Sequence, residues 1–259
     1  MSHLAALKRH RDLLWLWAAR ELRVRYKQSL LGVAWAVLQP LGLTMVFTFV
    51  FSRLVDVDTG KVPYPIFVYT ALVPWNFFTT ALSFGIPSLV NNMNLVKKIY
   101  FPREVLPLAS IGAAFADFLA ASVVFIGMLV FYRVCPQIHA LWVIPLLVVQ
   151  VVFTIGVTLL GSAVIVFFRD MRFVLPLVIQ VWMYATPIIY PVELVPEDLQ
   201  LVYFLNPMAG IIDGYRRVLV MGEPPRPSAF LVATVVSLML LVISYAFFKR
   251  VEPVFADVI

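Results

Sequence analysis

One acidic residue, Asp117, lies inside a long uncharged stretch of the sequence, where an ionisable group could move protons or bind a ligand. Ionisable side chains within a membrane are costly, and they usually face the protein interior with a partner. A proton relay would need a histidine or a second acid at helical spacing, and neither flanks Asp117. We therefore expect a structural, hydrogen-bonded role for Asp117, with a proton relay as the alternative.

Catalytic and nucleotide-binding motifs are absent from the sequence. It lacks the Gly-x-x-x-x-Gly-Lys-Ser/Thr phosphate loop and the Gly-x-Ser-x-Gly nucleophile elbow. The three histidines are scattered, and His139 has no cysteine or acid beside it at metal-ligand spacing. A single cysteine, Cys135, excludes an intrachain disulfide. We expect no catalytic residue, no metal site and no cofactor in this chain.

The composition indicates an all-α, polytopic membrane protein. Hydrophobic residues make up 62% of the 259 residues and charged residues 13%, whereas soluble domains are roughly half apolar and a quarter charged. The net charge of +6 could indicate a nucleic-acid partner. Membrane proteins, however, concentrate Lys and Arg in cytoplasmic loops, so we expect no nucleic acid. One membrane domain over residues 1–259 is predicted.

Charged residues divide the chain into stretches that could cross the hydrocarbon core, which is about 30 Å thick. We predict six transmembrane helices, at residues 32–51, 65–84, 108–131, 142–168, 173–190 and 230–248. An interface helix over residues 11–28 precedes them. We expect no secretory leader, because charges flank the short apolar patch at residues 13–19.

The basic residues predict the orientation. With six spans, 14 of the 20 Lys and Arg residues fall on the side that holds both termini, which is therefore predicted to be cytoplasmic. The loops on the other side would hold Arg53, Lys61, Arg133, Arg216, Arg217 and Arg226.

The N-terminal segment is predicted to be an amphipathic helix at the cytoplasmic interface. Arg20, Arg23 and Lys27 fall on one helical face, and Leu13 and Trp17 supply an apolar side. Such a helix could dock another subunit, or it could serve only as a lipid anchor.

The predicted loop at residues 91–104 is polar, basic and aromatic. Pro102 breaks it into short pieces, and Tyr100 and Phe101 stand beside Arg103. These residue types dominate the energetics of protein interfaces, so a docking surface is one interpretation. A solvated basic loop that merely obeys the charge rule is the other.

The predicted fifth span is interrupted by three prolines, Pro176, Pro187 and Pro191, so its helix is expected to end near Tyr184. An uncharged run of only 14 residues, 199–212, follows. That length predicts re-entrant helices between the fifth and sixth spans, on the periplasmic side. Interrupted hydrophobic segments of this kind can mark a transport pathway, although an ordinary external loop is the alternative.

Four sequence segments resemble motifs of type-2 ABC exporter permeases for polysaccharides. They are Arg20–Trp35 with the following Gln39-Pro40, Asn94–Glu104, Tyr184–Pro191 and Leu205–Met208. The resemblance extends from about Arg20 to Arg217. It implies a half-transporter that pairs with a second copy and with two ATP-binding subunits, which bind ATP and Mg. The implied substrate is a lipid-linked polysaccharide of the O-antigen class, exported across the bacterial inner membrane, with membrane lipids as further partners.

The resemblance also implies two groups of functional residues. ATPase coupling is expected at Arg20, Arg23, Arg25, Tyr26, Lys97, Lys98, Tyr100, Phe101, Arg103 and Glu104. Aromatic side chains can stack on sugars, and the candidates for the substrate pathway are Trp35, Phe67, Tyr69, Trp75, Trp182, Tyr184 and Tyr190. For most of these aromatics, a belt at the membrane interface is the alternative.

Other functions remain open from the residues alone. The substrate could be teichoic acid, capsule or a drug. A membrane-embedded enzyme acting on lipid-linked sugars would need paired carboxylates or a histidine cluster, which Asp117 alone does not supply. An ion channel would need a repeated pore segment or a charged ring.

Overall fold

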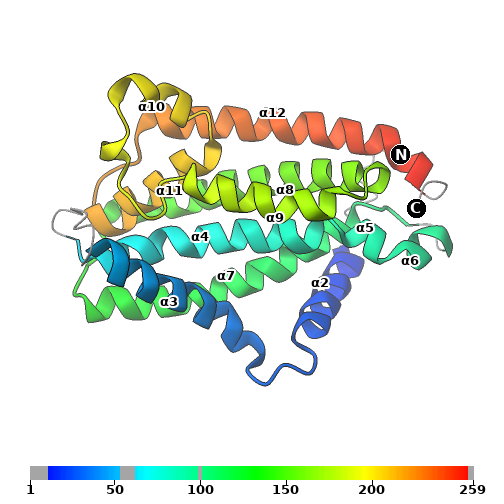
Figure 1. The fold of residues 1–259 in the computed structure, drawn as a ribbon, viewed down its shortest axis with the longest axis horizontal. Coiled ribbons are helices and arrows are strands. Elements are labelled where there is room, and N and C mark those ends of the chain that lie inside the picture. Colours follow the sequence, from blue (N-terminus) through cyan, green and yellow to red (C-terminus); the bar gives the residue numbers. More distant parts are fainter. Residues whose placement is uncertain (1–10, 53–61, 99–100, 256–259) are drawn as a thin grey trace.

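The computed structural model describes residues 11–52, 62–98 and 101–255. Over these ranges the chain is helical without strands, which confirms the all-α prediction. Figure 1 shows an elongated bundle of long, roughly parallel or antiparallel helices. The α-helices are α2 (Arg11–Tyr26), α3 (Trp35–Phe47), α4 (Tyr64–Gly85), α5 (Ser88–Asn91), α6 (Met93–Lys98), α7 (Val105–Phe131), α8 (Val143–Phe167), α9 (Met171–Tyr184), α10 (Glu197–Tyr203), α11 (Pro207–Arg216) and α12 (Pro227–Val251).

Within the described residues, five helical stretches are long and apolar enough to cross a membrane. They are Gly32–Ser52, Tyr64–Gly85, Val105–Phe131, Ile138–Phe167 and Pro227–Val254. Each coincides with a predicted span to within a few residues, except that the last extends further at its C-terminal end. The protein is therefore a multi-pass membrane protein.

The predicted span at residues 173–190 is not one continuous helix. Helix α9 has 14 residues and ends at Tyr184, so it is about 21 Å long, short of the roughly 30 Å of hydrocarbon. Pro187 cannot donate a backbone hydrogen bond, and it disfavours helical geometry at Thr186. The stop near Tyr184, predicted from the prolines, is confirmed.

The two ends of the bundle differ in composition. One end holds α5, α6 and the last turn of α12 (Figure 1), and we call it the basic end because Lys97, Lys98, Lys249 and Arg250 lie there. The opposite end holds α10 and the start of α12. Helix α9 begins at the basic end, and the chain reaches α10 at the opposite end.

Helix α4 is the centre of the bundle and packs against α3, α7, α8 and α11. Its side chains are largely buried, and the main hydrophobic core forms around them. Gln150 of α8 joins three helices: its Nε2 donates to the carbonyl of Pro74 in α4 at 2.7 Å, and its Oε1 accepts from the Tyr215 hydroxyl of α11 at 3.1 Å. A buried polar side chain is thus paired at both ends.

Helix α11 is wholly buried and approaches its neighbours closely. A Cβ atom at Gly210 would lie 2.9 Å from the carbonyl oxygen of Ala229 in α12, and one at Gly214 would lie 2.7 Å from Leu146 in α8. Two glycines one turn apart therefore let α11 fit between α8 and α12. This fixes α11 to the start of α12.

Candidate functional site

A stripe of uncharged polar residues runs along one face of the membrane span α4. Asn76, Thr79, Thr80 and Ser83 have helical spacing i, i+3, i+4 and i+7, which places them on the same face. All four are partly or fully exposed, in contrast to the otherwise largely buried helix. We call these four residues the polar stripe.

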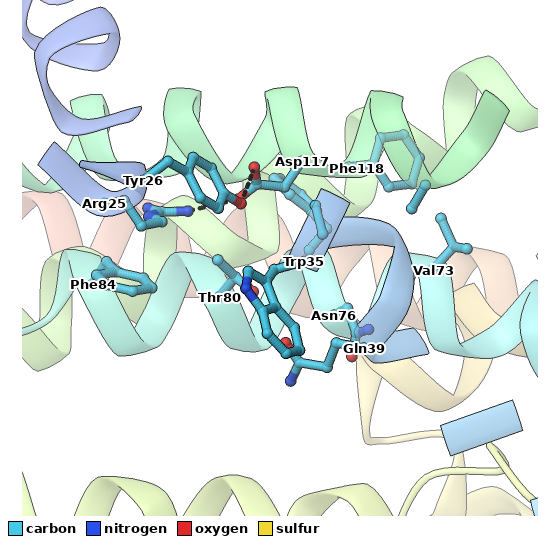
Figure 2. Close-up of a pocket in the computed structure, with 13 residues that line it drawn as sticks. Arg25, Tyr26, Trp35, Gln39, Val73, Asn76, Thr80, Phe84, Asp117 and Phe118 are labelled. Atoms are coloured by element: carbon cyan, nitrogen blue, oxygen red, sulfur yellow. Dashed lines mark hydrogen bonds and ion pairs between the residues drawn. The ribbon is translucent and has the colours of Figure 1, made fainter. Parts of the chain in front are cut away.

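Two pockets open on the polar stripe. The first, about 170 Å³, lies between α2, α3, α4 and α7 and is lined by Asn76 and Thr80 (Figure 2). The second, about 380 Å³, is lined by Thr79 and Ser83 together with residues of α9. Gln39 of α3 lines both pockets. The stripe and Gln39 therefore form a continuous polar surface between α3 and α9.

The polar surface has free hydrogen-bonding capacity. In the part of the chain that the structure describes, no side-chain hydrogen bond involves Gln39, Asn76, Thr80 or Ser83, and Thr79 Oγ1 donates weakly to the Asn76 carbonyl at 3.3 Å. Amides and hydroxyls both donate and accept. These uncharged groups can therefore bind a neutral, hydroxyl-rich molecule, beside the charged Arg25 and Asp117 in the first pocket and Arg172 in the second.

The first pocket is closed at one side by three paired polar residues. The guanidinium Nη1 of Arg25 lies 2.6 Å from Asp117 Oδ2, and the Tyr26 hydroxyl donates to Asp117 Oδ1 at 2.8 Å (Figure 2). Arg25 also stacks over Phe84, 3.9 Å from the ring centroid. The expected hydrogen-bonded state of Asp117 is confirmed, whereas the proton-relay alternative is untested.

Burial, and secondarily the hydrogen bond to Asp117, raise the pKa of Tyr26 to about 12. The hydroxyl therefore stays protonated at neutral pH and remains a donor to Asp117. Together with Arg25 it fixes the last turn of α2 to the middle of α7, and these two helices pack along each other. Helix α2 is thus attached to protein, and lipid is not its only support.

The residues expected to couple to an ATPase fall into three groups. Arg20, Arg23, Lys97 and Lys98 are exposed. Arg25 and Tyr26 point inward to Asp117, and Phe101, Arg103 and Glu104 pack toward α12, with Glu104 only 1% exposed. Tyr100 lies outside the described residues. The first group is accessible to a partner, whereas the other two groups make contacts within this chain.

The aromatic candidates for the pathway are also divided. Phe67, Tyr69 and Trp75 lie in the core, away from both pockets on the stripe. Trp182 packs edge-on against Phe78 and Phe153, and its Nε1 donates to Asn206. Tyr190 is hydrogen-bonded to Tyr203. Trp35 and Tyr184 are exposed, and Trp35 lines the first pocket.

The sequence interpretation therefore included Trp35 but missed the polar residues of α4 that line the pockets. The pathway candidates were aromatic side chains. In the structure, however, most aromatic residues of α4 lie in the core, and the amides and hydroxyls of the stripe face outward. The spacing of the stripe, read against an apolar span, is a signal that could have revealed it.

Arg216 is a second residue that sequence reasoning placed wrongly. It was assigned to an external loop, but it is 2% exposed. Its guanidinium donates to the carbonyl oxygens of Pro187, Ile188 at 2.5 Å and Tyr190 at 3.2 Å, and to that of Phe67 at 3.2 Å. Tyr64 donates to the Ile189 carbonyl at 2.8 Å.

These bonds explain how the chain leaves α9 without exposing its backbone. Residues 185–190 are non-helical, and several are buried. Backbone of this kind at membrane depth needs partners from the protein. Arg216 and Tyr64 supply them from α11 and α4.

Sequence comparison with known proteins identifies a family and several relatives of this chain. Residues 12–220 match the model of the ABC-2 type transporter family. An O-antigen export system permease protein RfbA of Klebsiella pneumoniae is 34% identical over 82% of this chain and 81% of its own length. The RfbA permease of Myxococcus xanthus is 26% identical over 97% of this chain and 96% of its own length. The polysialic acid transport protein KpsM of Escherichia coli is 19% identical over 78% of this chain and 79% of its own length.

Proposed function

This chain belongs to the ABC-2 type transporter family, and on that basis we propose that it is the permease subunit for export of a lipid-linked polysaccharide of the O-antigen class. Relatives named as O-antigen export permeases match most of the chain. Transport, and no enzymatic reaction, is the activity of this family's membrane subunits. ATP and Mg would bind to two partner subunits, and a second copy of this chain would complete the membrane part.

The polar stripe carries the proposal for the substrate. A polysaccharide presents many hydroxyl groups, so its passage requires hydrogen-bonding partners that can be exchanged at low cost. Asn76, Thr79 and Ser83, with Gln39 opposite, offer such partners on a helix that is otherwise apolar or buried. A drug-like apolar substrate would favour a hydrophobic lining.

The topology that we propose has six crossings with both termini in the cytoplasm. Five crossings are the long helices, and the sixth combines α9 with the non-helical segment that Arg216 supports. The described chain starts and finishes at the basic end (Figure 1), and cytoplasmic sides are rich in Lys and Arg. Helices α10 and α11 would then be the periplasmic re-entrant pair, in a bacterial inner membrane.

The proposal can be tested by removing the hydrogen-bonding groups of the stripe. The triple variant Asn76→Leu, Thr79→Val, Ser83→Ala would be expressed with the partner ATPase and the polysaccharide-synthesising enzymes, and surface polysaccharide would be quantified by gel and antibody. We expect export to fall while the amount of permease in the membrane stays normal.

The matched control is Ser122→Ala with Thr234→Val. Both hydroxyls lie in membrane spans but bond only to their own helices, to the carbonyls of Phe118 and Phe230. Normal export in this control is expected. Normal export in the stripe variant would show that the stripe does not contact the polymer.

A further inference from the structure

A cluster of charged side chains joins the predicted coupling segment to the end of α12. Lys249 Nζ lies 2.6 Å from Glu104 Oε1 and 2.9 Å from Glu252 Oε2. Arg103 closes the group, because its backbone N–H donates to Glu252 Oε1 at 3.0 Å and its guanidinium donates to the Glu252 carbonyl. We call Arg103, Glu104, Lys249 and Glu252 the α12 charge cluster.

The charge cluster is shielded from solvent. The side chains of Glu104, Lys249 and Glu252 are 1%, 13% and 17% exposed. Separating buried opposite charges is far more costly than separating surface pairs. The segment before α7 and the end of α12 must therefore move together unless this cluster is broken.

A hydrophobic contact also joins the segment at residues 93–104 to the end of α12. Phe248 and Phe255, both fully buried, pack in one hydrophobic group with Val96 of α6 and Leu106 of α7, and Phe101 packs against that group. Displacement of the segment at residues 93–104 is therefore passed to the C-terminal turns of α12.

The other end of α12 is fixed just as closely. There Gly210 of α11 meets the carbonyl of Ala229, and Arg226, immediately before α12, pairs with Asp213 of α11 at 3.2 Å. Helix α11 in turn carries Arg216, which holds the non-helical segment after α9. A continuous packed helix of 25 residues thus connects the two ends.

We propose that Lys249 is a positioning residue for energy coupling, which holds α12 to the coupling segment so that movement of the basic end reaches α11 and the segment after α9. The proposal rests on the proposed function, because it takes an ATPase at the basic end as the source of the movement. It assigns Lys249 and Glu252 a role beyond the coupling residues expected from the sequence. No contact with the substrate is involved.

The test separates coupling from folding by comparing three variants in proteoliposomes with the partner ATPase. Lys249→Met alone leaves Glu104 buried without its cation, so reduced stability is expected. The double variant Lys249→Met with Glu104→Gln removes both charges and should restore the thermal unfolding midpoint. Arg250→Met is the matched control, because Arg250 is an exposed basic residue of the same helix turn.

The decisive quantity is polysaccharide exported per ATP hydrolysed. For the stable double variant we expect ATP hydrolysis to continue while this ratio falls by at least about fivefold, the lower end of the usual effects of coupling between sites. An unchanged ratio would show that the cluster only supports folding. Loss of ATP hydrolysis together with export would also overturn the proposal, because Lys249 would then be needed for assembly with the ATPase.

Failure of the proposed function gives a different result. In that case the wild-type protein with its ATPase would export no polysaccharide, and the Arg250→Met control would be equally inactive. The coupling role of Lys249 is refuted when the wild type exports and the double variant either exports as efficiently or loses ATP hydrolysis together with export.

Discussion

Arg25 lies at the end of α2 and forms an ion pair of 2.6 Å with Asp117 in the membrane span α7. Both side chains are largely buried, at 7% and 12% exposed. The sequence predicts an interface helix at this segment. The ion pair attaches that helix to the bundle. It also gives the acid in the span a structural partner.

The first prediction concerns Asp117→Asn. An asparagine keeps an acceptor for the Tyr26 hydroxyl but leaves the Arg25 charge buried without its anion, and removing one partner of a buried pair costs about 3–5 kcal/mol when nothing replaces it. We expect a lower thermal unfolding midpoint in detergent and an unchanged pH profile of export in membranes.

Asp170→Asn is the control for this variant, because Asp170 is exposed and its loss should change neither quantity. A shifted pH profile in Asp117→Asn would favour the proton relay. Restored stability in the double variant Arg25→Met with Asp117→Leu would support the structural role.

The second prediction concerns Arg216→Met. The change removes the donor to four backbone carbonyls, and each buried acceptor left without a partner costs about 1–3 kcal/mol. We expect little folded protein, measured as the monodisperse fraction after extraction. Arg217→Met is the control: that residue is partly exposed and bonds to Pro224 and Glu223 nearby. Equal yields of the two variants would contradict the role given to Arg216.

The positions of the spans along the chain were predictable from the sequence, because uncharged runs and prolines determine structure locally. The gap between Ser52 and Tyr64 and the end of α9 at Tyr184 followed from charges and prolines. Arg216 could not be placed in this way. Its partners Pro187 and Ile188 precede it by 29 and 28 residues, and no local pattern links an arginine to distant carbonyls.

The candidate site was predictable from the sequence only in part. The entry to the first span, with Trp35 and Gln39, does line the pockets. The role of α4 depends on which of its faces turns inward, and this is decided by packing against α7, α8 and α11. The ion pair between Glu104 and Lys249 likewise joins segments far apart in the chain. The sequence alone could indicate only that both residues are charged.

The third prediction compares two tryptophans. Trp75 is 3% exposed and Trp35 is 52% exposed, although both were candidates for the pathway. Trp75→Ala should cost about 3–5 kcal/mol by leaving a cavity, whereas Trp35→Ala should alter stability by less than about 0.5 kcal/mol. Thermal unfolding in detergent measures the difference. Reduced export by a stable Trp35→Ala variant would show that the first pocket is used. If Trp75→Ala were as stable as the wild type, the position of Trp75 in the core would be wrong.

The fourth prediction concerns the exposed basic residues at the basic end. Lys97 and Lys98 end α6 with exposed side chains, and no ion pair involves them within the described residues. If α6 docks the ATPase, Lys97→Glu with Lys98→Glu should weaken co-purification of the ATPase and reduce ATP-driven export, with greater loss at low salt, where charge effects are least screened. The permease itself should keep its thermal midpoint, because exposed charges contribute little to stability.

Arg133→Glu, a charge reversal in the turn after α7 at the opposite end, is the control. Equal loss of the ATPase in both variants would mean that net charge matters and the α6 surface does not, whereas selective loss in the lysine variant would place the partner on α6, next to the charge cluster that reaches α12.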